Sequence, residues 1–210
     1  MIRIKELNLS NNPLTNTGVN ALSKALHPGY ENIQTLKKLN LSGTGIGTGE
    51  KHERFGIADA LANMGNEYNT LYSNIEELDL SNNKLGKNGM NDLAHFASII
   101  GNPNLKKLNL SNNKMEDDDV THLNMIMDSN LMYGRDSTEP GNSINELNLS
   151  NTDITDNMFR NMSMYINNFI NRGKDKGEAN IIDLSNNKFS QDFKTSIMKH
   201  ESSANIILKN

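Results

Sequence analysis

A run of four acidic residues, Glu116–Asp117–Asp118–Asp119, is the densest set of side chains in this chain that could do chemistry. Carboxylate oxygens are common ligands of divalent cations, so the run could hold a metal ion. The run also opens a stretch with helical apolar spacing, and acidic side chains at a helix start are stabilised by the helix dipole. We therefore predict a helix start here in preference to a metal site.

Other residue types that catalyse reactions lack the spacing that catalysis needs. The histidines share no metal-ligand spacing, the repeated serines have no matching set of bases, and there is no cysteine to act as a thiol nucleophile. The histidines are His27, His52, His95, His122 and His200. We predict a chain that is not an enzyme and that has no catalytic residues, no metal and no cofactor.

A glycine-rich segment, residues 43–54, superficially resembles a phosphate-binding loop. It reads Gly-Thr-Gly-Ile-Gly-Thr-Gly-Glu-Lys-His-Glu-Arg. The Gly-Lys-Ser/Thr ending of a nucleotide-binding loop is absent, and the helix expected after it starts too late. We predict a flexible loop in preference to a nucleotide site.

Composition narrows the possible partners and locations. The net charge is −4 over 210 residues with both signs interspersed, which argues against nucleic acid as the main partner. No apolar stretch approaches the roughly 20 residues that a membrane span needs, and no secretory leader precedes Ile4. Asn-Leu-Ser, a glycan acceptor, recurs inside expected strands, where a sugar would obstruct the sheet. We therefore expect a cytoplasmic chain that does not insert into membranes.

An internal repeat supplies the elements that must position any site. The frame apolar-x-x-Leu-x-Leu-Ser-Asn-Asn-x-apolar, complete or nearly so, begins at Ile4, Leu36, Ile75, Leu105 and Ile144, and a weaker copy runs through Ile182. A period of about 25 to 40 residues indicates stacked supersecondary units. In each unit alternating leucines predict a strand with one buried face, and a helical apolar pattern follows. We expect a cycle of strand, turn, helix and return loop.

This frame resembles the leucine-rich repeat family, and its long helical segments are similar to those of the ribonuclease-inhibitor-like subfamily. The resemblance implies an α/β solenoid, a right-handed β-α superhelix shaped like a horseshoe, with parallel strands on the concave face and helices on the convex face. It covers nearly the whole chain. We therefore expect one domain over residues 1–210, with about six repeats and a short C-terminal closing strand.

The resemblance also assigns positions within each repeat. Equivalent strand positions would be Leu7, Leu39, Leu78, Leu108, Leu147, Ile182 and Ile207. The family's ladder asparagine, whose side-chain amide bonds neighbouring turn backbone, would be Asn12, Asn83, Asn113 and Asn187, with Thr44 and Thr152 replacing it in two units.

Two rows of polar residues are expected on the concave face, the usual binding surface of the family. The charge row is Glu6, Lys38, Glu77, Lys107 and Glu146, followed by Ile181. The Asx row is Asn8, Asn40, Asp79, Asn109, Asn148 and Asp183. Opposite charges on adjacent strands can pair laterally, each exposed pair contributing about 0 to 1 kcal/mol. We take Lys38, Asp79 and Lys107 as candidate contact residues of this face.

Tyrosines offer a second candidate surface. Four of them fall in expected return loops on one rim of the horseshoe, together with Arg135: Tyr30, Tyr68, Tyr72 and Tyr133. Tyrosine supplies a large contact area at low entropic cost, so this rim is a candidate partner-binding site. The alternative is that each ring covers the edge of its own repeat.

We therefore predict a noncatalytic scaffold that binds a protein partner. One alternative is a GTPase activator resembling the Ran-directed proteins of this subfamily, which would need a loop arginine such as Arg54, Arg135 or Arg172 to enter a GTPase site. Another is self-association through the N-terminal sheet edge, since open edges invite pairing. The abundance of Asn, Lys and Ile is typical of AT-rich genomes, as in many intracellular bacteria. A bacterial effector delivered to host cytosol would fit that composition.

Overall fold

The computed structural model of the protein describes residues 4–25, 35–47, 74–98, 104–128, 144–175, 179–199 and 205–209. Seven parallel strands form one sheet, and their order in the sheet is their order in the chain. The strands are β1 (Glu6–Asn8), β2 (Lys38–Asn40), β3 (Glu77–Asp79), β4 (Lys107–Asn109), β5 (Glu146–Asn148), β6 (Ile181–Asp183) and β7 (Ile206–Ile207). The predicted closing strand is therefore present as β7.

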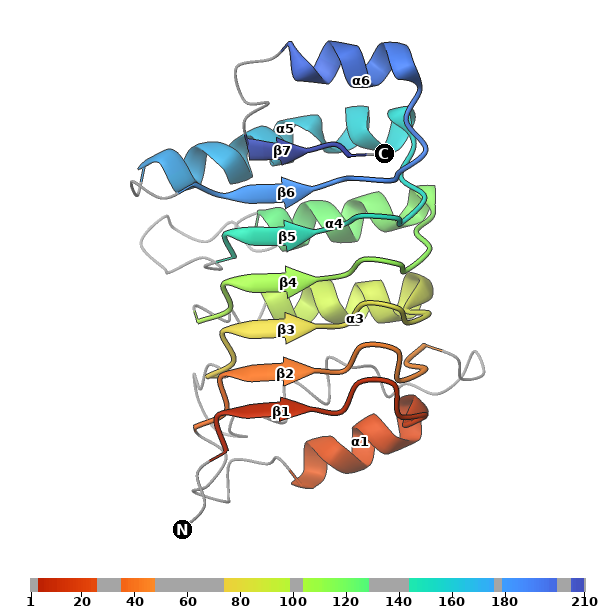
Figure 1. The fold of residues 1–210 in the computed structure, drawn as a ribbon, viewed down its shortest axis with the longest axis vertical. Helices are drawn as coiled ribbons and strands as arrows, with labels where there is room; N and C mark the ends of the chain where they lie inside the picture. Colours follow the sequence, from red (N-terminus) through yellow and green to blue (C-terminus); the bar gives the residue numbers. More distant parts are fainter. Residues whose placement is uncertain are drawn as a thin grey trace.

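Helices cover one face of this sheet and leave the other face open (Figure 1). They are α1 (Thr15–Ala25), α3 (Gly86–Ser98), the short 3-10 helix η1 (Asp117–Asp119), α4 (Val120–Met127), α5 (Asp156–Asp175) and α6 (Gln191–Met198). Helix α4 packs against α3 on one side and α5 on the other. Alternation of strand and helix along one stack confirms the predicted solenoid with strands on one face and helices on the other.

The strand register places equivalent side chains on common rungs. Leu7, Leu39, Leu78, Leu108, Leu147 and Ile182 are paired from strand to strand, as predicted. The seventh rung is Ile206, because Ile182 pairs with Ile206 and Asp183 pairs with Ile207. The prediction of Ile207 was wrong by one residue. Two consecutive isoleucines fit a strand in either register, so alternation could not choose between them.

The core lies between the sheet and the helices. The second leucine of each frame is fully buried in five consecutive repeats: Leu41, Leu80, Leu110, Leu149 and Leu184. The helices bury the predicted faces against this row, including Val19 of α1, Leu93 of α3, Leu123 of α4 and Met162 of α5. At the far end, the Phe193 ring of α6 meets Phe159 of α5 and Phe189 edge-on or tilted, with centroids 5.4 and 5.7 Å away.

The two residues that follow each serine of the repeated frame have separate roles in the turn. The first adopts positive φ, between 55° and 64°, in all six repeats: Asn11, Gly43, Asn82, Asn112, Asn151 and Asn186. This left-handed conformation is strained for most residues but accessible to Asn and Gly. The frame therefore needs Asn or Gly at this position for backbone geometry alone.

The second residue is the predicted ladder asparagine, and Asn83 shows what it does. Its Nδ2 donates to the carbonyl oxygens of Leu80, in its own repeat, and Leu41, in the preceding repeat, at 2.9 Å each. Its Oδ1 accepts the backbone N–H groups of Thr44 and Ile46 at 3.0 and 3.2 Å. Asn187 repeats this pattern on the turn that contains Thr152. Each such amide therefore joins two repeats.

Part of the predicted glycine-rich loop is a packed turn. Gly43, Gly45 and Gly47 all have positive φ, and Ile46 O accepts the N–H of Lys84 from the next repeat at 2.9 Å. A Cβ on Gly47 would lie 1.7 Å from the Lys84 carbonyl oxygen. Residues 48–54 lie outside the described residues.

The first repeat is less covered than the others. Ile4 is 46% exposed, whereas its equivalents Leu36, Ile75, Leu105 and Ile144 are at most 3% exposed. Leu7, Leu9 and Leu14 are half-buried. Strand β1 is the edge of the described sheet, so no described repeat covers its outer side.

Candidate functional site

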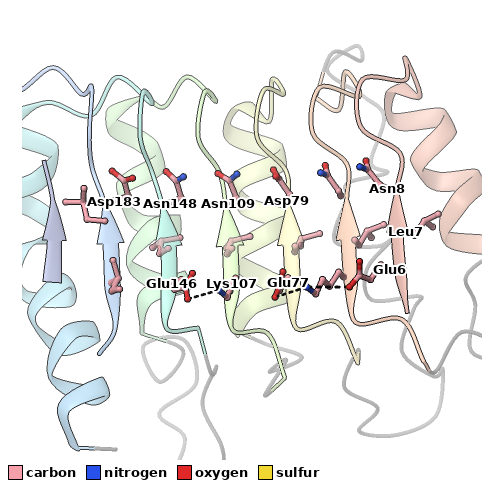
Figure 2. Close-up of a pocket in the computed structure, with 18 residues that line it drawn as sticks. Glu6, Leu7, Asn8, Glu77, Asp79, Lys107, Asn109, Glu146, Asn148 and Asp183 are labelled. Atoms are coloured by element: carbon pink, nitrogen blue, oxygen red, sulfur yellow. Dashed lines mark ion pairs between the residues drawn. The ribbon is translucent and has the colours of Figure 1, made fainter. Parts of the chain in front are cut away.

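The open face of the sheet forms a hollow that we call the concave groove. It has a volume of about 820 Å³, and residues from all seven strands line it. The charge row and the Asx row cross this face side by side, one near the start and one near the end of each strand (Figure 2). Lys38, Asp79 and Lys107, the candidate contact residues of this face, all line the groove.

The charge row is laterally paired, as predicted. Lys38 Nζ lies 3.5 Å from a carboxylate oxygen of both Glu6 and Glu77, and Lys107 Nζ lies 2.8 Å from Glu146 Oε1. The negative charges of Glu6 and Glu77 raise the pKa of Lys38, and the hydrogen bond to Glu146 raises the pKa of Lys107. These pairs are solvent-exposed, so each contributes little to stability. Their main effect is to compensate both cations of the groove.

The Asx row has a structural role that the sequence analysis did not predict. Each Oδ1 accepts the backbone N–H of the serine two residues later, at 2.9 to 3.1 Å, in all six repeats. This is an Asx turn, which closes the end of each strand from β1 to β6. The signal was present in the sequence as Asn or Asp two residues before every frame serine.

A comparison with known families identifies the type of repeat that forms this sheet. A family model described as Leucine Rich repeat matches residues 4–23, 32–49, 73–94 and 101–123. Each matched segment contains one of the strands β1 to β4. The chain contains leucine-rich repeats. No curated protein gave a match.

The leucine-rich repeat architecture continues past the matched segments. Strands β5 and β6 extend the same sheet, and their turns carry the positive-φ residues Asn151 and Asn186. The ladder amide of Asn187 also spans these two repeats. The concave groove therefore runs over repeats of one kind from β1 to β6.

The character of the groove changes at its C-terminal end. Where the charge row would continue, β6 carries Ile181, and β7 presents Ile207 opposite Asp183. Both isoleucine side chains are half-buried and line the groove. This end of the leucine-rich repeat sheet therefore combines apolar surface with the carboxylate of Asp183.

The predicted tyrosine rim falls outside the described residues. This applies to Tyr30, Tyr68, Tyr72, Tyr133 and Arg135, and also to Arg54. Arg172 is described: its guanidinium lies over the Phe169 ring at 5.6 Å, and burial lowers the pKa of this guanidinium. Arg172 is therefore part of helix α5 and packs on Phe169 of the same helix instead of projecting from a loop.

The acidic run begins a helix, as predicted. Residues 117–119 form η1, which leads directly into α4, and the N–H of Glu116 donates to Asp119 Oδ2 at 2.9 Å. Asp119 is 2% exposed, and burial raises the pKa of its carboxyl. No group of three or more potential metal ligands occurs among the described residues. None of the helices in the described part of the chain combines the length and hydropathy of a membrane span.

Proposed function

We propose that this leucine-rich repeat chain is a noncatalytic scaffold of the ribonuclease-inhibitor-like type that binds a protein along the concave groove. Leucine-rich repeats generally mediate protein–protein interaction. The observation that supports the groove is its extent: one continuous hollow of about 820 Å³ crosses every strand. A partner lying along it could contact all repeats at once.

The binding mechanism is preorganisation. Asx turns close the strand ends, and the ladder amide of Asn83 fixes the turn of its neighbour. Backbone that is already ordered loses little entropy when a partner docks, so more of the contact energy appears as affinity. The regular repeat thus supplies rigidity, and the exposed row residues supply the contacts.

The tyrosine-bearing loops are a second part of the same proposal. Tyr68, Tyr72 and Tyr133 belong to the long return segments between repeats, on one rim of the predicted horseshoe. Contacts from this rim would add to those of the groove. Cytoplasmic location, delivery to a host and self-association through the β1 edge stay predictions.

Display selection tests the proposal and separates the two surfaces. Binders from a naive library of displayed protein fragments would be selected on the intact chain and then measured against three variants. The groove variant is Lys107→Ala with Glu146→Ala, which removes both members of an ion pair and so creates no new unpaired charge. The rim variant replaces Tyr68, Tyr72 and Tyr133 with Ala. The control is Asp192→Ala with Lys199→Ala, exposed positions of α6 and its C-terminal end.

We expect most selected binders to lose about tenfold or more in affinity for the groove variant, as for central interface residues. The affinity of the binders for the control variant should equal their affinity for the unmodified chain. Loss confined to the rim variant would move the site to the loops and contradict the groove. Binders that tolerate all three variants would overturn the proposal.

A further inference from the structure

We propose that the concave groove takes an extended basic segment of its partner, with cationic side chains four residues apart that pair with Asp79 and Asp183. This inference rests on the proposed function and names the class of segment that the groove fits. It follows from the net charge of the groove, from the carboxylates that no cation compensates, and from the strand spacing between them.

The groove is negatively charged. Five carboxylates line it, from Glu6, Glu77, Asp79, Glu146 and Asp183, and two ammonium groups, from Lys38 and Lys107, so its net charge is −3. The net charge of the whole chain is −4. A groove with an excess of one sign of charge attracts ligands of the opposite sign. An acidic segment or a nucleic acid backbone would be repelled.

The uncompensated charge is localised in the Asx row. Lys38 is held by Glu6 and Glu77, and Lys107 by Glu146, so both cations are already paired within the charge row. Among the described residues, neither Asp79 nor Asp183 takes part in an ion pair. Each uses Oδ1 to accept the N–H of its serine, at 2.9 Å. The second oxygen of each carboxylate is thus left for a partner (Figure 2).

The two aspartates define a spacing. Asp79 is on β3 and Asp183 on β6, in the same row and three strands apart. Neighbouring strands lie about 4.8 Å apart, so the two carboxylates are separated by about 14 Å across the sheet. An extended chain rises about 3.4 Å per residue, so four residues span the same distance, and residues i and i+4 point to the same side. Residues three apart point to opposite sides.

The surroundings of Asp183 fit the long stem of a basic side chain. Ile181 lies two residues earlier on β6, and Ile207 is paired with Asp183 on β7. Lysine and arginine cover apolar surface with their methylene groups while the charged end reaches a polar partner. At Asp79 the neighbouring Asx residues are Asn40 and Asn109 instead. We therefore expect the Asp183 end to contribute more to affinity.

A titration with defined peptides, followed by NMR on the ¹⁵N-labelled intact chain, tests this inference. The probe is an acetylated and amidated peptide of Gly, Ser and Thr with two lysines four residues apart. One matched control has the same composition with the lysines three residues apart, and a second has glutamates in their place. The amide resonances of Ser81 and Ser185 report binding, because these N–H groups donate to the two aspartates. Ser10, whose N–H donates to Asn8 on β1 outside the span between the two aspartates, is the internal reference.

Two isosteric substitutions remove the charge without removing the Asx turn. Asp79→Asn and Asp183→Asn keep an Oδ1 acceptor, and asparagine already occupies this row in four other repeats. Each substitution should lower the affinity for the lysine peptide about two- to fivefold, as expected for exposed ion pairs. Added salt should lower this affinity further. Asp192→Asn on α6 removes the same charge elsewhere and should leave affinity unchanged.

Three results would overturn the inference: no shift of Ser81 and Ser185 at millimolar probe, equal affinity for the doubly substituted chain, or tighter binding of the glutamate peptide. Groove-dependent library binders that lack basic residues would also overturn it and leave the proposed function intact. Absence of any groove-dependent binder would instead contradict the proposed function itself.

Discussion

The side-chain oxygen of Asn83 accepts the backbone N–H of Thr44, which is 39 positions earlier in the chain, at 3.0 Å. The same side chain also donates to the carbonyl oxygens of Leu41 and Leu80. One buried carboxamide thus satisfies backbone groups of two repeats, which neither turn could satisfy alone.

Replacing this amide should be costly. Asn83→Ala leaves several buried N–H and carbonyl groups without partners, so we expect a loss of about 2 to 3 kcal/mol in the free energy of unfolding, measured with urea. Asn12→Ala is the matched control, because Asn12 is exposed and donates only within its own turn. We expect it to cost about 0.5 to 1 kcal/mol. Equal costs would show that bonding between repeats contributes nothing.

The positive-φ position can be tested at Asn186, whose φ is 56° and whose side chain is exposed. Asn186→Ala should destabilise the chain by about 1 kcal/mol, because a left-handed backbone strains alanine. Asn186→Gly should be close to neutral, as Gly43 already occupies this position in the second repeat. Thermal unfolding of both variants measures the difference. An alanine variant as stable as the glycine variant would argue against a conformational role.

Gly47 and Gly86 separate backbone strain from steric overlap. Both have positive φ, but a Cβ at Gly47 would overlap the Lys84 carbonyl, whereas a Cβ at Gly86 meets nothing within 4 Å. Gly86→Ala should therefore cost about 1 kcal/mol from conformation alone. Gly47→Ala should cost at least about 2 kcal/mol more, because the turn must move away from the next repeat. Chemical denaturation of the two variants checks this, and similar values would contradict the packed turn.

Asp119 should make stability depend on pH. Burial raises its pKa above the ordinary value of 3.8, so the folded state holds the proton more tightly than the unfolded state does. The stability that this provides is present below pH 3.8 and is lost as pH rises through the raised pKa. Asp119→Asn keeps an acceptor for the Glu116 N–H and does not titrate. The free energy of unfolding of Asp119→Asn, relative to that of the unmodified chain, should therefore increase as pH rises from 3.8 through the raised pKa of Asp119.

A control accompanies the Asp119 measurement. Asp117→Asn removes an exposed charge from the same run and should show no such rise with pH. His122 Nδ1 lies 3.9 Å from Asp119 Oδ1, and the positive charge of this imidazole partly opposes the effect of burial on the pKa of Asp119. A pH-independent difference between Asp119→Asn and the unmodified chain would exclude the proposed effect of burial.

Much of the fold could be predicted from the sequence because the same pattern of apolar and polar residues recurs in each repeat. Alternating leucines at Leu78 and Leu80, or Leu108 and Leu110, fix which face of each strand is buried. Equal patterns then stack in register, since a slip by one residue would expose every leucine. The lateral ion pairs of Lys38 and Lys107 followed from the same register. Where the pattern weakened, at Ile206 and Ile207, the prediction was wrong by one residue.

Tertiary structure decided what the repeated side chains do. The sequence showed that asparagine recurs, and the resemblance assigned Asn83 to the ladder, but only the tertiary structure showed which backbone groups of two repeats this amide joins. The tertiary structure also showed that Asp79 and Asp183 are carboxylates of the groove without an ion pair among the described residues, because ion pairing depends on which side chains meet across strands. Local alternation and turn preference are properties of a few neighbouring residues and are therefore visible in the sequence. The hydrogen bonds of the ladder and the ion pairs of the charge row join residues about a whole repeat apart. Only the stacking of the repeats therefore determines these contacts.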